Sequence, residues 1–209
     1  MQDWKANQAA KAVAAKALQV ANPHLIPVGE KVDQLNAAAK NTRTELKRAF
    51  PGVKFSVKTS RFSMGNDMRV TWTDGPNVYQ VEQITEQYSA GTFDGMTDCY
   101  NYERGAWTDA FGQAKYVLTD RHYSDAAIES AIRYVKQEYA GNLKDREITE
   151  ITAAQFNAGK LYDVAVMENS DSGYWGLQSI IRRTLDKKTW CLNMTPKAME
   201  MVEADEVAA

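Results

Sequence analysis

Residues 51–102 read PGVKFSVKTSRFSMGNDMRVTWTDGPNVYQVEQITEQYSAGTFDGMTDCYNY, and the fold is decided within this stretch. Apolar and polar residues alternate over residues 53–58 and again over residues 68–73, on either side of a turn sequence at residues 63–66. Alternation with a period of two is typical of strands that bury one side. The stretch therefore predicts a β-hairpin with one apolar and one polar face.

The sequence after this hairpin predicts a helix and two further strands. Asp74-Gly75-Pro76 is typical of a helix start, with Asp74 or Gly75 near the cap and Pro76 in the first turn. The buried face of that helix is expected to consist of Val78, Val81, Ile84 and Tyr88. A third strand is expected at residues 96–102 and a fourth at residues 115–119.

Helices are expected before and after this region of the sequence. Residues 3–21 are rich in Ala and lack Gly and Pro, and residues 30–49 place apolar side chains on one helical stripe. Ser124 is a helix cap, followed by apolar residues at helical spacing as far as Gly141. The order α-β-β-α-β-β-α predicts an α+β fold, with about four strands in an antiparallel or mixed sheet and helices packed on one face.

The C-terminal third has weaker patterns. A short helix is expected at residues 152–158, a strand at 161–167 and a helix at 174–185. The chain is accordingly divided into an N-terminal helical segment (1–28), a core domain (29–141), a C-terminal α/β extension packed on the core (142–197) and an acidic tail (198–209).

The composition is that of a globular protein without a membrane span. The chain has 209 residues, of which 44% are hydrophobic and 25% charged. No apolar run approaches the roughly 18 residues that cross a bilayer, and the N-terminus has no signal-peptide core. Cys99 and Cys191 are too few for a disulfide framework. A reducing cytoplasm is therefore the expected compartment.

Charge is unevenly distributed along the chain. Residues 1–61 contain eleven Lys/Arg and four Asp/Glu, a net charge of +7, so the remainder carries −9 within the total of −2. The last ten residues add Glu200, Glu203, Asp205 and Glu206 without a basic neighbour. This asymmetry favours a polyanion-binding region and an acidic tail that recruits a partner. The alternative is a set of solvated helix faces followed by a frayed end.

The polar side of the predicted hairpin is the first candidate site. It carries Lys54, Lys58 and Arg69, with Arg61 at the hairpin, and Tyr100 and Tyr102 share one side of the expected third strand. Cations beside aromatic rings are typical of proteins that bind single-stranded nucleic acid, because phosphates meet the cations and bases stack on the rings. The alternative is a face covered by the N-terminal helix, with lysines extending from its edge.

A second candidate is the basic cluster Arg182, Arg183, Lys187 and Lys188 at the end of the last expected helix. Positions 183 and 187 lie one helical turn apart and are able to grip phosphates. The alternative is a solvated helix end whose cations favour the C-terminal dipole.

Catalytic chemistry has little support in the sequence. Asp74 and Asp94 each precede a glycine, a pairing that is commoner in turns and caps than in metal sites. His24 and His122 have no neighbouring nucleophile and no partner at ligand spacing. No glycine-rich phosphate loop is present. We expect neither an enzyme nor a metal or cofactor site.

Four segments of the chain carry a family resemblance: FPGVKFSVK (50–58), VTWTDGP (70–76), FDGMTD (93–98) and KYVLTDRHYS (115–124). They resemble the large polyvalent protein-associated domain family that is the twenty-ninth of its series, over residues 44–139. This family occurs in proteins of phages and conjugative plasmids, so the resemblance implies a mobile-element protein acting in a bacterial cytoplasm. It supplies no catalytic residues. In size, basic front and acidic end the chain is also similar to the single-stranded-DNA-binding RNA polymerase cofactors of lytic podoviruses.

These observations lead to one functional expectation and its alternatives. The expected function is single-stranded DNA binding in support of viral transcription or replication, with RNA polymerase or another such protein as partner of the acidic tail. The alternative is an inhibitor that binds a host defence or transcription complex and mimics nucleic acid through the net negative charge of residues 62–209. A metal-dependent nuclease is a third reading. The oligomeric state is left open.

Overall fold

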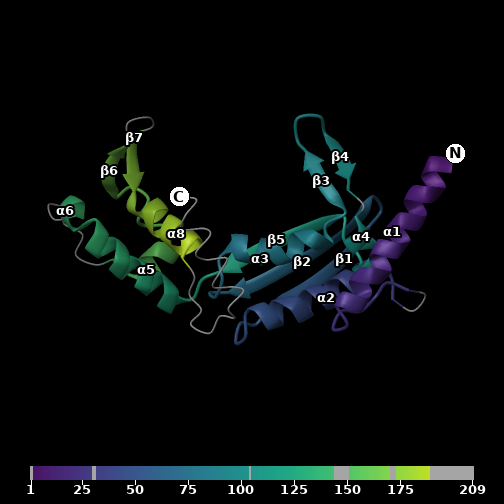
Figure 1. Ribbon diagram of the computed structural model, residues 1–209. Coiled ribbons are helices and arrows are strands. Elements are labelled where there is room, and N and C mark those ends of the chain that lie inside the picture. Colours follow the sequence, from purple (N-terminus) through teal and green to yellow (C-terminus); the bar gives the residue numbers. More distant parts are fainter. Residues whose placement is uncertain (1, 30–31, 104, 144–150, 170–172, 189–209) are drawn as a thin grey trace. The chain divides into compact units, whose positions relative to one another are not determined.

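The computed structural model describes residues 2–29, 32–103, 105–143, 151–169 and 173–188 (Figure 1). Within these ranges the chain forms two compact units. The first contains the residues up to Trp72 and residues 78–120, and the second contains residues 73–77 together with the described residues from Arg121 onward. The fold is α+β, as expected. The division between units differs from the expected segments, because helix 125–138 belongs to the second unit.

The first unit contains ten elements: α1 (Gln2–Ala21), α2 (Gln34–Ala49), β1 (Ser56–Phe62), β2 (Gly65–Thr73), α3 (Val78–Thr85), the 3₁₀ turn η1 (Glu86–Tyr88), β3 (Gly91–Asp94), β4 (Cys99–Tyr102), α4 (Ala106–Phe111) and β5 (Tyr116–His122). Strands β1 and β2 form the expected antiparallel hairpin. The sheet order is β1-β2-β5, and the sheet is mixed.

The expectation of a third sheet strand at residues 96–102 is wrong. Residues 99–102 form β4, which pairs with β3 in a separate antiparallel hairpin, and β5 takes the third place in the sheet. Strand β3 begins at Gly91, whose φ of 156° and close approach to β4 exclude a side chain, since a Cβ there would lie 1.9 Å from the Asn101 carbonyl oxygen. The hairpin therefore depends on a glycine at its first position.

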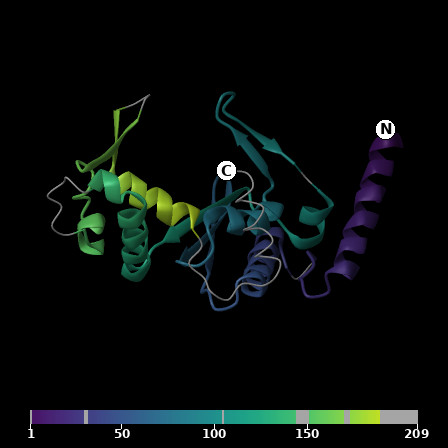
Figure 2. The ribbon, with the colours of Figure 1, turned by 60° about the vertical axis from the view of Figure 1, so that its left-hand side comes forward.

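Helices cover one side of the three-stranded sheet. The core beneath it is formed by buried side chains of the sheet and of α2, α3 and α4, among them Leu46, Met68, Val70, Trp72, Val81, Ile84 and Phe111. Helix α1 contacts α4 rather than the sheet (Figure 2). The Gln19 amide donates to the Ala110 carbonyl oxygen at 3.3 Å in this contact. The leading alanine-rich helix is thus an addition to the helical side.

A buried amide that the sequence did not indicate joins these helices. Asn41 of α2 is fully buried, and its Nδ2 donates to the carbonyl oxygens of Ile26 at 2.8 Å and Phe111 at 3.0 Å. Its Oδ1 accepts from the Ile26 N–H at 2.7 Å. Because these bonds satisfy a buried polar group, Asn41 fixes the connector after α1 and the end of α4 against α2.

The second unit contains α5 (Asp125–Glu138), α6 (Ala140–Leu143), α7 (Ala153–Asn157), β6 (Ala165–Asn169), β7 (Gly173–Gly176) and α8 (Leu177–Lys187). Ser124 caps α5 as expected, accepting from the Ala127 N–H at 3.2 Å. Two expectations are wrong. Gly141 lies within α6 instead of ending α5, and residues 174–176 belong to β7, so α8 begins at Leu177.

The segment after β2 is held inside the second unit by polar contacts. Asp74 has a φ of 58°, and its carboxylate accepts from the Ser124 N–H at 2.9 Å. Arg121 donates to the carbonyl oxygens of Gly75 at 2.8 Å and Leu185 at 3.0 Å. The expected role of Asp74 as cap of α3 is therefore wrong: its carboxylate orders the start of α5 instead.

Candidate nucleic-acid interface

The strand register separates the two faces of the sheet. Val57 lies opposite Val70 on the side that faces the helices, whereas Lys58 lies opposite Arg69 on the other side. We call this other side the outer face; it carries Ser56, Lys58, Ser60 and Phe62 of β1 and Asp67, Arg69 and Thr71 of β2. Because Val117 of β5 packs against the core, strand alternation places Tyr116, Leu118 and Asp120 on the outer face as well. Within the described residues of the first unit, helices α2, α3 and α4 share the core with Val57, Met68 and Val70, on the opposite side of the sheet.

Three of the predicted cations belong to this face. Lys58 and Arg69 are exposed and face each other across the two strands, and no described residue forms an ion pair or hydrogen bond with either. Lys54 is also exposed and precedes β1 by two positions, so strand alternation places it on the same side. The outer face also contains two carboxylates, Asp67 and Asp120, so its cations are interspersed with negative charge.

Arg61 does not belong to the outer face. It pairs with Asn66 in the register, on the helical side, and its guanidinium forms a 2.8 Å ion pair with Asp33, the N-cap residue of α2. The Asn36 N–H and, to a lesser extent, Arg61 lower the pKa of the Asp33 carboxyl. The grouping of Arg61 with the other hairpin cations is therefore corrected: it joins β1 to the start of α2.

Tyr100 and Tyr102 lie on β4, outside the three-stranded sheet, and differ from each other. The half-buried Tyr100 donates its hydroxyl to the carbonyl oxygens of Gly91 (2.9 Å) and Lys115, and burial raises its pKa. Tyr102 is 59% exposed, with its ring centroid 4.7 Å from that of Tyr100. Tyr100 therefore anchors the β3–β4 hairpin, whereas Tyr102 is accessible for stacking.

Two aromatic rings on the outer face were not singled out from the sequence. Phe62 and Tyr116 stack with centroids 6.3 Å apart and planes 20° apart, and Phe62 is 47% exposed. The Phe62 ring lies over Gly65, where an added Cβ would come 3.4 Å from that ring and 2.7 Å from the Lys115 side chain. Phe62 could have been found, because it shares the strand parity of Lys58. Tyr116 could not, since its place depends on the pairing of β5.

Lys115 connects the outer face with the β3–β4 hairpin. Its Nζ lies 5.3 Å from the ring centroids of both Tyr100 and Tyr116 and donates to the Met64 carbonyl oxygen at 3.0 Å. The Tyr100 and Tyr116 rings are themselves 5.5 Å apart. A cation held between rings in this way is stabilised by the negative ring faces. The result is a continuous aromatic row, Phe62-Tyr116-Tyr100-Tyr102, whose first member lies on the same face of β1 as Lys58.

The second basic cluster lies in the other unit, and the structure separates its members. Arg182 is 3.6 Å from Asp186 and 5.4 Å from the Tyr123 ring centroid, and burial raises the pKa of Tyr123 to about 12. Lys188 lies 4.5 Å from the Tyr134 ring centroid. A pocket of about 270 Å³ is lined by Tyr134, Tyr139, Ile180, Arg183, Thr184, Lys187 and Lys188. Arg183 and Lys187 therefore line one pocket, as their spacing predicted, whereas Arg182 lies beside Asp186 and the Tyr123 ring.

The aspartates considered for catalysis have local structural roles. The Asp94 carboxylate accepts from the Met96 N–H and the Thr97 hydroxyl, both at 2.9 Å, and the Met96 N–H lowers its pKa. It closes the β3–β4 turn.

Across the described ranges, no three His, Cys, Asp or Glu residues gather closely enough to hold a metal ion. Nor is any helix in those ranges both long and apolar enough to cross a bilayer. The acidic tail, 198–209, lies outside them.

Comparison with known proteins gives a family for the segment that carries the outer face. No curated protein and no solved structure matches the chain, so the similarity to podovirus RNA polymerase cofactors stays a prediction. Residues 34–124, from α2 to the cap of α5, match the family model described as large polyvalent protein associated domain 29. Over this part of the chain, which is less than half of its length, the sequence is similar to the large polyvalent protein associated domain 29 family.

Proposed function

We propose that this protein is a non-enzymatic, single-strand nucleic-acid-binding protein that uses the outer face of its sheet. The observation that carries the proposal is the Lys58–Arg69 pair, two exposed cations opposite each other on the outer face, for which the described residues supply no ion-pair or hydrogen-bond partner. The Phe62–Tyr116 stack lies on the same face. Cations and accessible rings on one surface supply both interactions that a single strand offers, its phosphates and its base faces.

In this proposal the phosphates meet Lys54, Lys58 and Arg69, while bases stack on Phe62 and Tyr102. Base–aromatic stacking contributes roughly 1–3 kcal/mol per base and requires bases that are not paired within a duplex. A flat sheet face with rings along one end is suited to such unstacked bases. A helix placed to enter a major groove would favour duplex DNA, and no sequence pattern of that kind is present.

The family occurs in phage and plasmid proteins, and the proposed setting is accordingly viral transcription or replication in a bacterial cytoplasm. The acidic residues 198–209 would then contact a protein partner such as an RNA polymerase. Short acidic termini can recruit protein partners, and they can also compete with nucleic acid for a basic surface.

Two arginines provide a matched test. Arg69 lies on the outer face and Arg61 on the helical side of the neighbouring strand. The test is a fluorescence anisotropy titration with a labelled single-stranded oligonucleotide of mixed sequence. Arg69→Gln is expected to weaken binding about tenfold, the scale of one hydrogen bond to a charged group, whereas Arg61→Gln leaves the affinity unchanged.

A duplex of the same sequence is the second ligand in that titration, and it is expected to bind more weakly than the single strand. Equal losses for both arginine variants would contradict the assignment of the face. If the folded wild-type protein bound neither oligonucleotide, the proposal would fail. The protein-binding inhibitor considered from the sequence would then be the better reading.

A further inference from the structure

Helices α5 and α8 of the second unit share an apolar core, and the pocket of about 270 Å³ lies beside it. Tyr134 and Tyr139 line this pocket from the C-terminal half of α5 and from its cap. The residues that line it from α8 and its cap are Ile180, Arg183, Thr184, Lys187 and Lys188. The described lining thus contains three cations and no acidic residue, so it favours an anionic ligand.

The end of α8 does not itself require these cations. Cations near a helix C-terminus usually interact with the last carbonyl oxygens of the helix. Here the Arg121 guanidinium donates to the carbonyl oxygens of Leu185 and Lys188, both at 3.0 Å. The Asn77 amide donates to the Lys187 carbonyl oxygen at 3.4 Å. Because these carbonyls already have donors, a role in capping α8 does not account for the ammonium groups of Lys187 and Lys188.

The cations at this end of α8 have different surroundings. Arg182, outside the pocket, lies 3.6 Å from the Asp186 carboxylate. The Lys188 ammonium lies 4.5 Å from the centroid of the Tyr134 ring, which belongs to the pocket wall. The negative face of a ring attracts a cation but carries no net charge. Lys188 is therefore held at the pocket with its charge available to an anion.

The size and the walls of the pocket select among anions. Its volume is below the roughly 300–1,000 Å³ of pockets for drug-sized ligands, so it suits one small molecule or the end of a chain. Arginine and lysine bind phosphate through charge-assisted hydrogen bonds. Tyr134 and Tyr139 add aromatic rings, against which a base can lie. We propose that this pocket binds a nucleoside monophosphate, either free or as the 5′-phosphorylated end of a strand.

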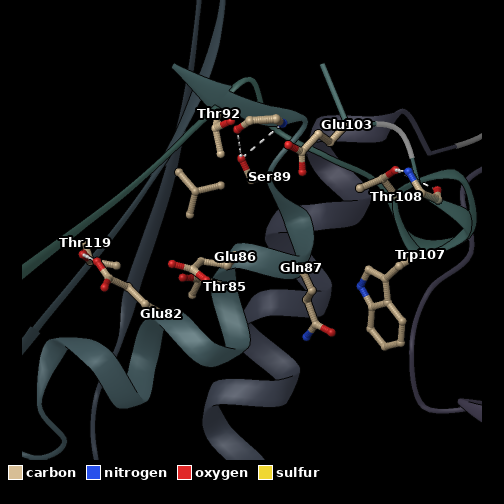
Figure 3. A pocket seen from close by; sticks show the side chains of 13 residues that line it. Glu82, Thr85, Glu86, Gln87, Ser89, Thr92, Glu103, Trp107, Thr108 and Thr119 are labelled. Atoms are coloured by element: carbon tan, nitrogen blue, oxygen red, sulfur yellow. Dashed lines mark hydrogen bonds between the residues drawn. The ribbon is translucent and has the colours of Figure 1, made fainter. Parts of the chain in front are cut away.

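A pocket of the first unit has a different lining. Its volume is about 540 Å³, and its described lining includes the carboxylates of Glu82, Glu86 and Glu103 (Figure 3). The Glu82 carboxylate accepts from the Thr119 hydroxyl at 2.9 Å. Carboxylates repel a phosphate, so the proposal applies to the pocket beside α5 and α8.

Isothermal titration of the full chain with adenosine 5′-monophosphate, in the absence of nucleic acid, tests this inference. Lys187→Gln is expected to weaken binding about fivefold, the scale of a partly exposed ion pair. The control is Lys136→Gln, an equally exposed lysine of α5 that does not line the pocket, and it leaves the affinity unchanged. The double variant Lys58→Gln/Arg69→Gln also leaves it unchanged, so the result is separable from that of the outer face.

Inorganic phosphate as a second probe separates the contribution of the rings from that of the cations. It is expected to bind more weakly than the nucleotide, because it has no base to lie against a ring. Tyr134→Leu should reduce the affinity for the nucleotide and leave that for inorganic phosphate unchanged. Phosphate that binds as tightly as the nucleotide would overturn the inference, since the rings would then contribute nothing.

A pair of short single-stranded oligonucleotides, one with a 5′-phosphate and one with a 5′-hydroxyl, distinguishes the two sources of the ligand. In the Lys58→Gln/Arg69→Gln background, tighter binding of the phosphorylated oligonucleotide identifies a strand end. Equal binding of the two, together with binding of the free nucleotide, identifies a small molecule. The inference fails if the folded wild-type protein does not bind the nucleotide, or if Lys136→Gln weakens binding as much as Lys187→Gln.

Discussion

Arg121 shows how a charged residue of β5 becomes part of the second unit's interior. Its side chain is 6% exposed, and its guanidinium donates to the carbonyl oxygens of Asp74 (3.2 Å), Gly75 (2.8 Å), Leu185 (3.0 Å) and Lys188 (3.0 Å). Burial lowers its pKa. The planar guanidinium reaches both the loop after β2 and the C-terminal end of α8, where free carbonyls favour a cation.

Replacement of Arg121 is expected to destabilise the protein strongly. Arg121→Met leaves several buried carbonyls without donors, and the free energy of unfolding should fall by about 3 kcal/mol or more. Arg121→Lys should recover little of this loss, because an ammonium group cannot reach both segments. Urea unfolding measures the effect. The control is Arg182→Met, because the Arg121 and Arg182 guanidinium groups both lie near the Tyr123 ring, at 5.1 Å and 5.4 Å from its centroid, and Arg182 is exposed. This variant should change stability by less than about 1 kcal/mol.

At the scale of single residues, strand alternation predicted which hairpin cations face solvent. The roles of Arg61 and Arg121 were not predictable, because they depend on partners distant in sequence. Lys58 and Arg69 follow the strand period, so their shared face was evident from the sequence. Arg61 has the opposite parity, yet its role became clear only with Asp33 beside it. The burial of Arg121 could not be predicted, because its partners are backbone carbonyls far along the chain.

At the scale of elements, α2 is defined by a charged cap. Asp33 accepts from the Asn36 N–H at 3.1 Å and pairs with Arg61 at 2.8 Å. Asp33→Ala should lower the free energy of unfolding by about 1 kcal/mol at pH 7, the usual contribution of an N-cap. Urea unfolding of the variant and of Asp163→Ala, an exposed aspartate outside any helix, measures this difference.

The contribution of Asp33 should depend on pH in a definite direction. Its pKa is lowered from the usual 3.8, so the folded state favours the ionised carboxylate. The stabilisation is therefore present above pH 3.8 and is lost as the pH falls through the lowered value. Asp33→Ala and wild type should converge in stability in strong acid. A difference that persists undiminished there would contradict the charged cap.

The β3–β4 hairpin should depend on one tyrosine hydroxyl and not on the other. Tyr100→Phe removes a donor to two carbonyl oxygens and should lower stability by about 1 kcal/mol or more. Tyr102→Phe removes an exposed hydroxyl without a described partner and should have no effect. Thermal unfolding of the two variants compares them. Equal midpoints would show that Tyr100 does not anchor the hairpin.

Elements with long, regular patterns were predictable, and short ones were not. The β1–β2 hairpin and helices α2 and α5 carry enough repeats to reveal their period. Strand β3 has four residues and α4 has six, too few for a pattern. The position of β5 in the sheet was not predictable either, because β2 and β5 are brought together by contacts distant in sequence.

At the scale of the whole molecule, the uneven distribution of charge along the sequence did not predict which cations lie on the outer face. The N-terminal excess of cations includes Arg61, engaged with Asp33, and Arg43, which donates to the Val57 carbonyl oxygen. The outer face keeps Lys54, Lys58 and Arg69 and gains Lys115 at its aromatic end. The described chain also divides at the ends of β2 and β5, a boundary that composition does not mark.

The salt dependence of single-stranded DNA affinity tests the central claim most directly. Engagement of about three phosphates by Lys54, Lys58 and Arg69 should give a slope of log K against log salt near −2, since each phosphate contributes about −0.7 on a single strand. The double variant Lys58→Gln/Arg69→Gln should reduce the steepness by about 1.4. A slope near zero, or a slope that the double variant leaves unchanged, would contradict binding at this face.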